Sequence, residues 1–150
     1  MGDPAAVPER PPSEAEWEDL LVRYEIAPRA ARIAVEDAPD APAPEALERL
    51  VAGEHAARAA LDAMREGRPL PDASSLERQA GLTARGAADL FASLRARNFA
   101  AVQRRGIDVW EWSAPDAGGG RMTPYRLLSA AVAMDARALA ELRGHAGDGR

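Results

Sequence analysis

Four segments of this chain carry apolar residues at a spacing of three and four, and this periodicity constrains the fold more than any other feature of the sequence. The spacing places apolar side chains on one face of an α-helix, whereas a half-buried strand needs strict alternation. The composition agrees, because aromatic residues make up only 5% of the chain, β-branched residues are sparse and alanine recurs throughout. The sequence therefore predicts an all-α protein.

Capping and turn residues mark the ends of the predicted helices. Ser13 is followed three residues later by a glutamate, which makes a capping box, and Thr123 before Pro124 marks the start of the last helix. Gly67 is expected to end the second helix, and Pro28 to kink or split the first. The apolar faces are expected within residues 17–35, 47–64, 87–102 and 127–142.

Three of these faces contain a polar residue. Glu54 stands inside the second face, Asn98 inside the third, and Asp135 lies on or beside the buried edge of the fourth. The expected inner face of the third helix consists of Ala87, Leu90, Phe91, Leu94, Asn98, Ala101 and Val102. These polar residues are candidates for a site inside the protein.

Four amphipathic helices, each with one apolar face, pack economically as a four-helix bundle. We expect the bundle to span residues 13–143, after a disordered lead-in at 1–12 and before a flexible tail at 144–150. The connections between the helices are long enough to allow a crossover, so simple up-and-down order is not required.

The residue inventory excludes several kinds of chemistry. The chain has no cysteine and only two histidines, and all 19 of its basic residues are arginine. This excludes disulfides, zinc–thiolate and iron–sulfur sites, a lysine Schiff base, and a three-histidine metal site within one chain. A net charge of -5 argues against nucleic acid or an acidic membrane surface as a partner. Without a signal peptide or a membrane-spanning run, we expect a cytoplasmic protein.

The order of features along the chain resembles a known family. The matching pieces are residues 17–35, EALERLVAGEHAARAALDAM (45–64), LFASLRARNFAAVQ (90–103) and, most specific, WEWSAPDAGGGRMTPYRLLSAAVAMDARALAELRG (110–144). Together they resemble the DinB-like superfamily of small bacterial four-helix bundles, over residues 13–143. The resemblance implies a bundle in up-down-down-up order, often dimeric. It also implies a divalent metal on three histidines, and in some members the transfer of low-molecular-weight thiols.

The chain departs from the family at all three metal-ligand positions. If Glu54 is the glutamate that follows the family's first histidine by five residues, the ligand position is Arg49. Aligning the H-D-x-x-H pattern of the last helix on Asp135 places Met134 and Ala138 at the other two ligands. An arginine cannot lose its proton and repels a metal ion, and alanine has no donor atom. We therefore expect no bound metal and no cofactor.

The residues around the lost metal site form a candidate pocket, and two interpretations of it remain open. The candidate residues are Arg49, Glu54, Asn98, Met134, Asp135 and Ala138. In one interpretation the guanidinium of Arg49 replaces the ion and pairs with Glu54 and Asp135. In the other, these groups lie at the edge of the apolar faces and reach water. Likewise, Arg95 and Arg97 either line an anion pocket or form a solvated helix face.

The sequence favours a non-catalytic DinB-like protein that binds a small molecule or another protein. A homodimer is compatible with this hypothesis. No catalytic residue is assigned. One alternative is a divergent metal-dependent thiol transferase or hydrolase that recruits Glu54, His55 and Asp135 into a rearranged site. Another is a structural subunit that pairs through an exposed helix face.

Overall fold

The computed structural model describes residues 12–72, 81–103, 111–116 and 118–148. Within these residues it contains four long helices: α1 (Glu14–Val35), α2 (Glu45–Glu66), α3 (Ala84–Gln103) and α4 (Pro124–Asp148). This confirms the prediction of an all-α four-helix bundle. Most of the expected lead-in at 1–12 lies outside the described residues. The last helix continues past Arg143 into the segment that was expected to be a tail.

The helix ends follow from the caps in the sequence. Ser13 accepts a hydrogen bond from the Glu16 amide and Glu16 reaches back to the Ser13 amide, which completes the capping box. Gly67 ends α2 with a φ of 69°, the left-handed conformation that glycine adopts without strain. Thr123 accepts from the amide of Arg126 at the start of α4. Pro28 lies inside α1 and is buried, and α1 continues past it as a single helix.

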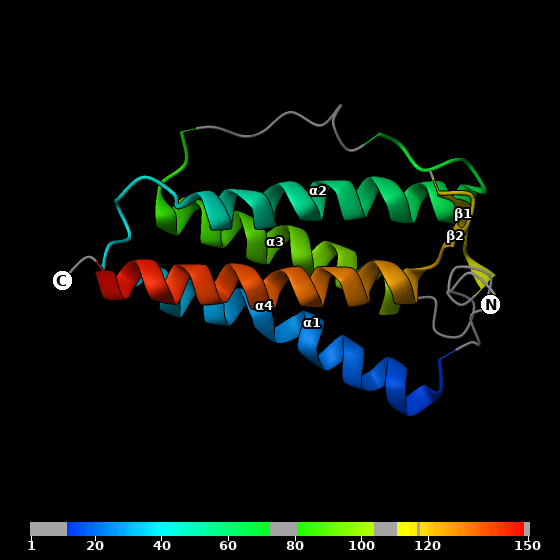
Figure 1. Cartoon of the computed structure of the whole chain (residues 1–150), viewed down its shortest axis with the longest axis horizontal. Helices are drawn as coiled ribbons and strands as arrows, with labels where there is room; N and C mark the ends of the chain where they lie inside the picture. The colour runs from blue at the N-terminus through cyan, green and yellow to red at the C-terminus, as the bar shows by residue number, and fades with distance from the viewer. Residues whose placement is uncertain (1–11, 73–80, 104–110, 117, 149–150) are drawn as a thin grey trace.

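The four helices have the up-down-down-up order. Figure 1 shows α1 and α4 running in one direction and α2 and α3 running in the other. Each of α1 and α2 packs mainly against α3 and α4, so α1 and α2 lie on one diagonal of the bundle. Because α2 and α3 run the same way, the end of α2 and the start of α3 lie at opposite ends of the bundle (Figure 1). Just before α3, Pro42 and Thr83 form an isolated antiparallel bridge that ties the α1–α2 connection to the start of α3.

A short hairpin precedes α4, where the sequence predicted only a loop. Strands β1 (Ala114–Pro115) and β2 (Arg121–Met122) pair antiparallel. The carboxylate of Asp116 accepts hydrogen bonds from the amides of Gly118 and Gly120, at 2.9 Å each, and Gly119 has a φ of 85°. Two-residue strands are too short to show alternation, which explains why periodicity did not predict them.

The apolar core consists of two clusters, one in each half of the bundle. The first contains Ala27, Ala31, Val35, Ala46, Leu47, Leu50, Val51, Ala84, Ala87, Ala88, Phe91, Ala138, Leu139 and Leu142. The second contains Trp17, Leu20, Tyr24, Ala60, Leu61, Met64, Val102, Ala114 and Leu128. Along α2, α3 and α4, the residues of one cluster come before a buried polar residue and those of the other come after it, and on α1 the buried Tyr24 is the last residue of the second cluster.

The inner face of α3 differs from the expected one. Leu90 and Leu94 are only partly buried, whereas Ala84, Ala88 and Arg95 are buried. The buried face of α3 is therefore rotated about the helix axis relative to the expected face, and Phe91 and Arg95 lie at its centre. This rotation brings Arg95 into the core, so the interpretation of Arg95 as part of a solvated helix face is wrong.

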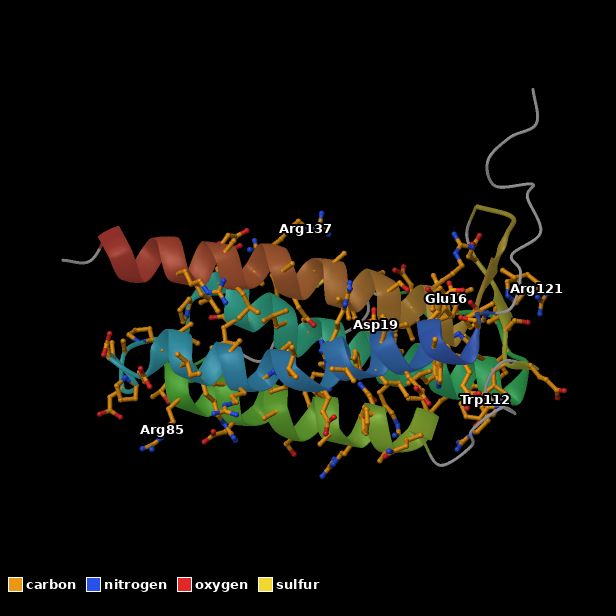
Figure 2. The ribbon with its side chains drawn as sticks, turned by 90° about the horizontal axis from the view of Figure 1, so that it is seen from below. Glu16, Asp19, Arg85, Trp112, Arg121 and Arg137 are labelled. Atoms are coloured by element: carbon orange, nitrogen blue, oxygen red, sulfur yellow. The ribbon has the colours of Figure 1, made fainter. Side chains whose placement is uncertain are left out.

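Charged side chains lie on the outer faces of the bundle, and α1 also exposes apolar residues. In Figure 2, Arg85 on α3 and Arg137 on α4 point away from the other helices, and both are exposed. Among the described residues, no helix is long and apolar enough to cross a lipid bilayer.

Candidate functional site

A layer of buried polar side chains crosses the middle of the bundle, and every helix contributes to it. The layer consists of Tyr24 on α1, Glu54 on α2, Arg95 and Asn98 on α3, and Asp135 on α4. These residues expose between 0% and 3% of their surface. Such groups are rarely buried unless they are paired, so their contacts determine whether the layer can exist.

Arg95 lies at the centre of this layer. Its Nη1 and Nη2 donate to Oδ2 and Oδ1 of Asp135, both at 2.8 Å, in the bidentate geometry that suits a carboxylate. Its Nε and Nη2 lie 2.6 Å from Oε1 of Glu54, and Nη1 also donates to the backbone carbonyl of Tyr24 at 2.7 Å. The guanidinium therefore links three helices to α3.

Two aromatic rings lie close to the guanidinium of Arg95. The Cζ atom of Arg95 lies 3.9 Å from the centre of the Tyr24 ring and 4.8 Å from that of Phe91. Both distances are within the range of an attractive cation–π contact. Phe91 precedes Arg95 by one helical turn, so the local helix geometry alone places this ring against the cation.

The carboxylate of Glu54 is saturated by its neighbours. Its Oε1 accepts from Arg95, and its Oε2 accepts from the Tyr24 hydroxyl at 3.0 Å and from the Asn98 amide at 2.8 Å. Asn98 also donates to the backbone carbonyl of Glu54 at 3.0 Å. Both side-chain oxygens of Glu54 are thus engaged from α1 and α3.

Burial sets the protonation of the layer. Burial and the charge of Glu54 raise the pKa of Tyr24, which remains a neutral hydrogen-bond donor. Burial alone lowers the pKa of Arg95, but the hydrogen bonds to Asp135 and the charges of both carboxylates outweigh it, so the net shift is upward. Burial raises the pKa of Asp135 and Glu54 adds to this, against the opposing effect of Arg95.

An apolar pocket of about 240 Å³ lies between α2 and α4 and reaches this layer. Its walls are formed by Leu50, Gly53, Ala56, Ala57, Ala60, Leu70, Pro71, Leu127, Ala130, Ala131 and Met134. Glu54, Arg95 and Asp135 also line it. The small residues on both helices leave this space, and the polar layer forms its floor.

The structure brings together three of the six predicted site residues. Glu54, Asn98 and Asp135 meet in the polar layer and are buried, so the interpretation that they reach water is wrong. Met134 is 39% exposed and lines the pocket. Ala138 is buried in the first apolar cluster and does not line the pocket.

Arg49 does not replace a metal ion in the bundle centre. Its side chain is 40% exposed and forms an ion pair with Glu141 on α4. The buried face of α2 contains Leu47, Leu50 and Glu54, and Arg49 lies at the edge of this face. The central guanidinium comes from Arg95, and Arg97 is exposed.

Two members of the layer, Tyr24 and Arg95, were not among the six candidate pocket residues, although an anion pocket lined by Arg95 was one of the two interpretations of that residue. Tyr24 was assigned to the core, but a buried phenol needs a hydrogen-bond partner, and that requirement points to another polar residue in the core. Arg95 stands three residues before Asn98 and four after Phe91, on the same face. This spacing, together with two buried carboxylates that require a cation, is the signal that would have identified Arg95.

The residues present do not fit a metal ion. The two carboxylates of the layer are both bonded to Arg95, and two carboxylates without a histidine are fewer than the three or four protein ligands that a zinc-type divalent metal site uses. Among the described residues there is no group of three or more histidine, aspartate or glutamate side chains that could hold a metal ion. Glu54, His55 and Asp135 therefore do not form the rearranged site of the enzyme alternative.

Comparison of the chain with protein-family models, with curated proteins and with solved structures finds no match in any of the three. The functional argument therefore depends on the geometry of the polar layer and the pocket.

Proposed function

We propose that this chain is a DinB-like four-helix bundle without the family's metal site, and that it acts as a non-catalytic small-molecule-binding protein. The proposed binding site is the pocket between α2 and α4. The single observation that carries this proposal is the pocket's position, which opens an apolar space of about 240 Å³ directly onto a buried ionic layer.

The polar layer supports a binding role in preference to catalysis. In Glu54 every carboxylate oxygen has a partner, and Arg95 carries a charge that it cannot give up as a proton. A general acid or base must exchange a proton, and a nucleophile needs an activating base. The layer instead provides a rigid polar floor under apolar walls, which is the usual construction of a ligand pocket.

Methyl NMR of labelled methionine tests this proposal. The chain has four methionines, of which Met134 lines the pocket and Met64 lies in the second apolar cluster. We expect a subset of small organic fragments to shift the methyl resonance of Met134 and to leave that of Met64 nearly unchanged. If no fragment in a diverse library shifts Met134 at millimolar concentration, the pocket is not a binding site.

A matched pair of glycine variants locates the binding. A Cβ atom added at Gly53 would lie 3.5 Å from the Met134 sulfur, so Gly53→Leu extends a side chain across the pocket. A Cβ atom at Gly144, also in a helix, would meet nothing within 4 Å. We expect Gly53→Leu to abolish the Met134 shift and Gly144→Leu to preserve it.

A second candidate role is self-association through α1. Val22, Ile26 and Ile33 are 58%, 59% and 55% exposed, and their spacing of four and seven places them on one outward face of α1. Exposed apolar faces of this kind are typical of protein contacts. We propose that a second copy of this chain packs against this face of α1. Light scattering tests this: a dimer that Ile26→Glu converts to a monomer supports it, and a monomer at high concentration rejects it.

A further inference from the structure

The floor of the pocket carries an excess of negative charge. Glu54 and Asp135 contribute two carboxylates and Arg95 contributes one guanidinium. Among the described residues, all other side chains that line the pocket are aliphatic, methionine or proline, or belong to glycine. The remaining members of the layer, Tyr24 on α1 and Asn98 on α3, are neutral. An unbalanced buried charge is costly and favours a nearby positive charge or a proton.

Asp135 is the carboxylate that a ligand can reach. The two carboxylate oxygens of Glu54 accept three side-chain hydrogen bonds, whereas each oxygen of Asp135 accepts a single one, and both of these come from Arg95. An ionised carboxylate has about four acceptor sites, so Asp135 keeps acceptor capacity that no group among the described residues uses. Its side chain is 5% exposed, against 2% for Glu54 and 3% for Arg95.

The size of the pocket limits the ligand. An apolar cavity of about 150 Å³ is large enough to hold benzene. The pocket here, at about 240 Å³, therefore has room for one ring with a short arm, or for a short alkyl chain. The aliphatic walls favour an apolar body, and the floor favours a hydrogen-bond donor with a positive charge.

We propose that the pocket binds a small organic monocation, with its apolar body between α2 and α4 and its protonated amine directed at Asp135. This inference rests on the proposed function, since it names the ligand class of that same pocket. An anion would meet the excess negative charge, and a neutral molecule would leave it unbalanced. The raised pKa of Asp135 agrees with a carboxylate that lacks full compensation.

Calorimetric titration with benzylamine, benzyl alcohol and benzoate, which share one ring, tests the charge preference. We expect benzylamine to bind roughly tenfold tighter than benzyl alcohol, and benzoate to bind weakest. Equal or tighter binding of the alcohol would overturn the inference and leave the pocket as a site for neutral ligands. If none of the three binds, the inference is also wrong, while the fragment screen on Met134 separately decides the proposed function.

Two variants show whether Asp135 is the reason for the preference. Asp135→Asn removes the excess charge, and we expect it to abolish the preference for the amine over the alcohol. Because a buried substitution can prevent folding, Ala130→Lys provides a second test: Ala130 lines the pocket, is exposed, and would bring a competing cation to the rim. The matched control is Ala140→Lys, at an exposed position on α4 outside the pocket. A preference that survives both pocket variants would contradict the inference.

Discussion

The guanidinium of Arg95 and the carboxylate of Asp135 form two parallel hydrogen bonds of 2.8 Å across the α3–α4 contact, with both side chains at most 5% exposed. The same guanidinium bonds Glu54 on α2. One positive charge therefore serves two buried carboxylates from different helices, and the stability of the bundle centre depends on that charge.

Replacing Arg95 with methionine is expected to be strongly destabilising. The variant would leave Glu54 and Asp135 buried without a cation, and breaking such a pair costs about 3–5 kcal/mol. Urea unfolding followed by circular dichroism measures this loss. The control is Arg97→Met, because Arg97 is exposed two residues away and its replacement should change stability by no more than about 0.5 kcal/mol. Equal effects of the two substitutions would show that Arg95 is not the central cation.

Asp135 is expected to make stability depend on pH in a defined direction. Burial raises its pKa in the folded chain above the ordinary value of 3.8. At pH values between the unfolded-state pKa and the folded-state pKa of Asp135, the folded state binds more protons than the unfolded state. The contribution of Asp135 to the free energy of unfolding therefore falls as pH rises. Asp135→Asn removes the contribution, and the stability difference between wild type and variant should shrink from pH 4 upward. Unfolding at a series of pH values measures this difference. A gap that widens with pH would mean that Arg95 lowers the pKa below 3.8.

The hydroxyl of Tyr24 is expected to contribute measurably to stability. It donates to Oε2 of Glu54 at 3.0 Å, and hydrogen bonds to charged groups contribute about 1.5–3 kcal/mol. Tyr24→Phe keeps the ring over Arg95 and removes only this bond, so thermal unfolding should report a loss in that range. Tyr125→Phe is the control, since the ring of Tyr125 lies beside Trp17 at 6.4 Å and outside the polar layer. If the two variants are equally stable, the hydrogen bond from the Tyr24 hydroxyl to Glu54 does not contribute to the free energy of unfolding.

Gly53 is expected to make α2 less stable than an alanine would at the same position, and to leave space in the pocket. Glycine inside a helix is less favourable than alanine by roughly 0.5–1 kcal/mol, and a Cβ at Gly53 would make only an ordinary contact, 3.5 Å from the Met134 sulfur. Gly53→Ala should therefore raise the unfolding midpoint and weaken ligand binding. Gly144→Ala, also in a helix, should raise stability without changing binding. A loss of stability in Gly53→Ala would show that the pocket is narrower than described.

The architecture was predictable because its determinants are local. The capping box at Ser13, the stop at Gly67 and the start at Pro124 each depend on residues within one helical turn. The apolar spacing then defined four faces, and the polar residues Glu54 and Asp135 stood out against them. The hairpin at Ala114 was missed because its strands are too short to carry a periodic signal.

The centre of the site was not predictable in the same way, because its partners are distant in the sequence. Arg95 pairs with residues 41 and 40 positions away, and its spacing from Phe91 and Asn98 becomes informative only once the two carboxylates are known to be buried, so the sequence alone does not choose between Arg49 and Arg95 as the buried cation. The general rule that arginine is exposed favours solvent for both. That choice depends on the rotation of each helix about its own axis, which packing of the aromatic and alanine residues determines.

The metal content of the untagged protein tests most directly the claim that Arg95, and not a bound metal ion, occupies the bundle centre. Elemental analysis for zinc, nickel and iron should find far less than one ion per chain, and a chelator should leave the thermal midpoint unchanged. One tightly bound ion per chain, together with a lower midpoint after its removal, would contradict the account.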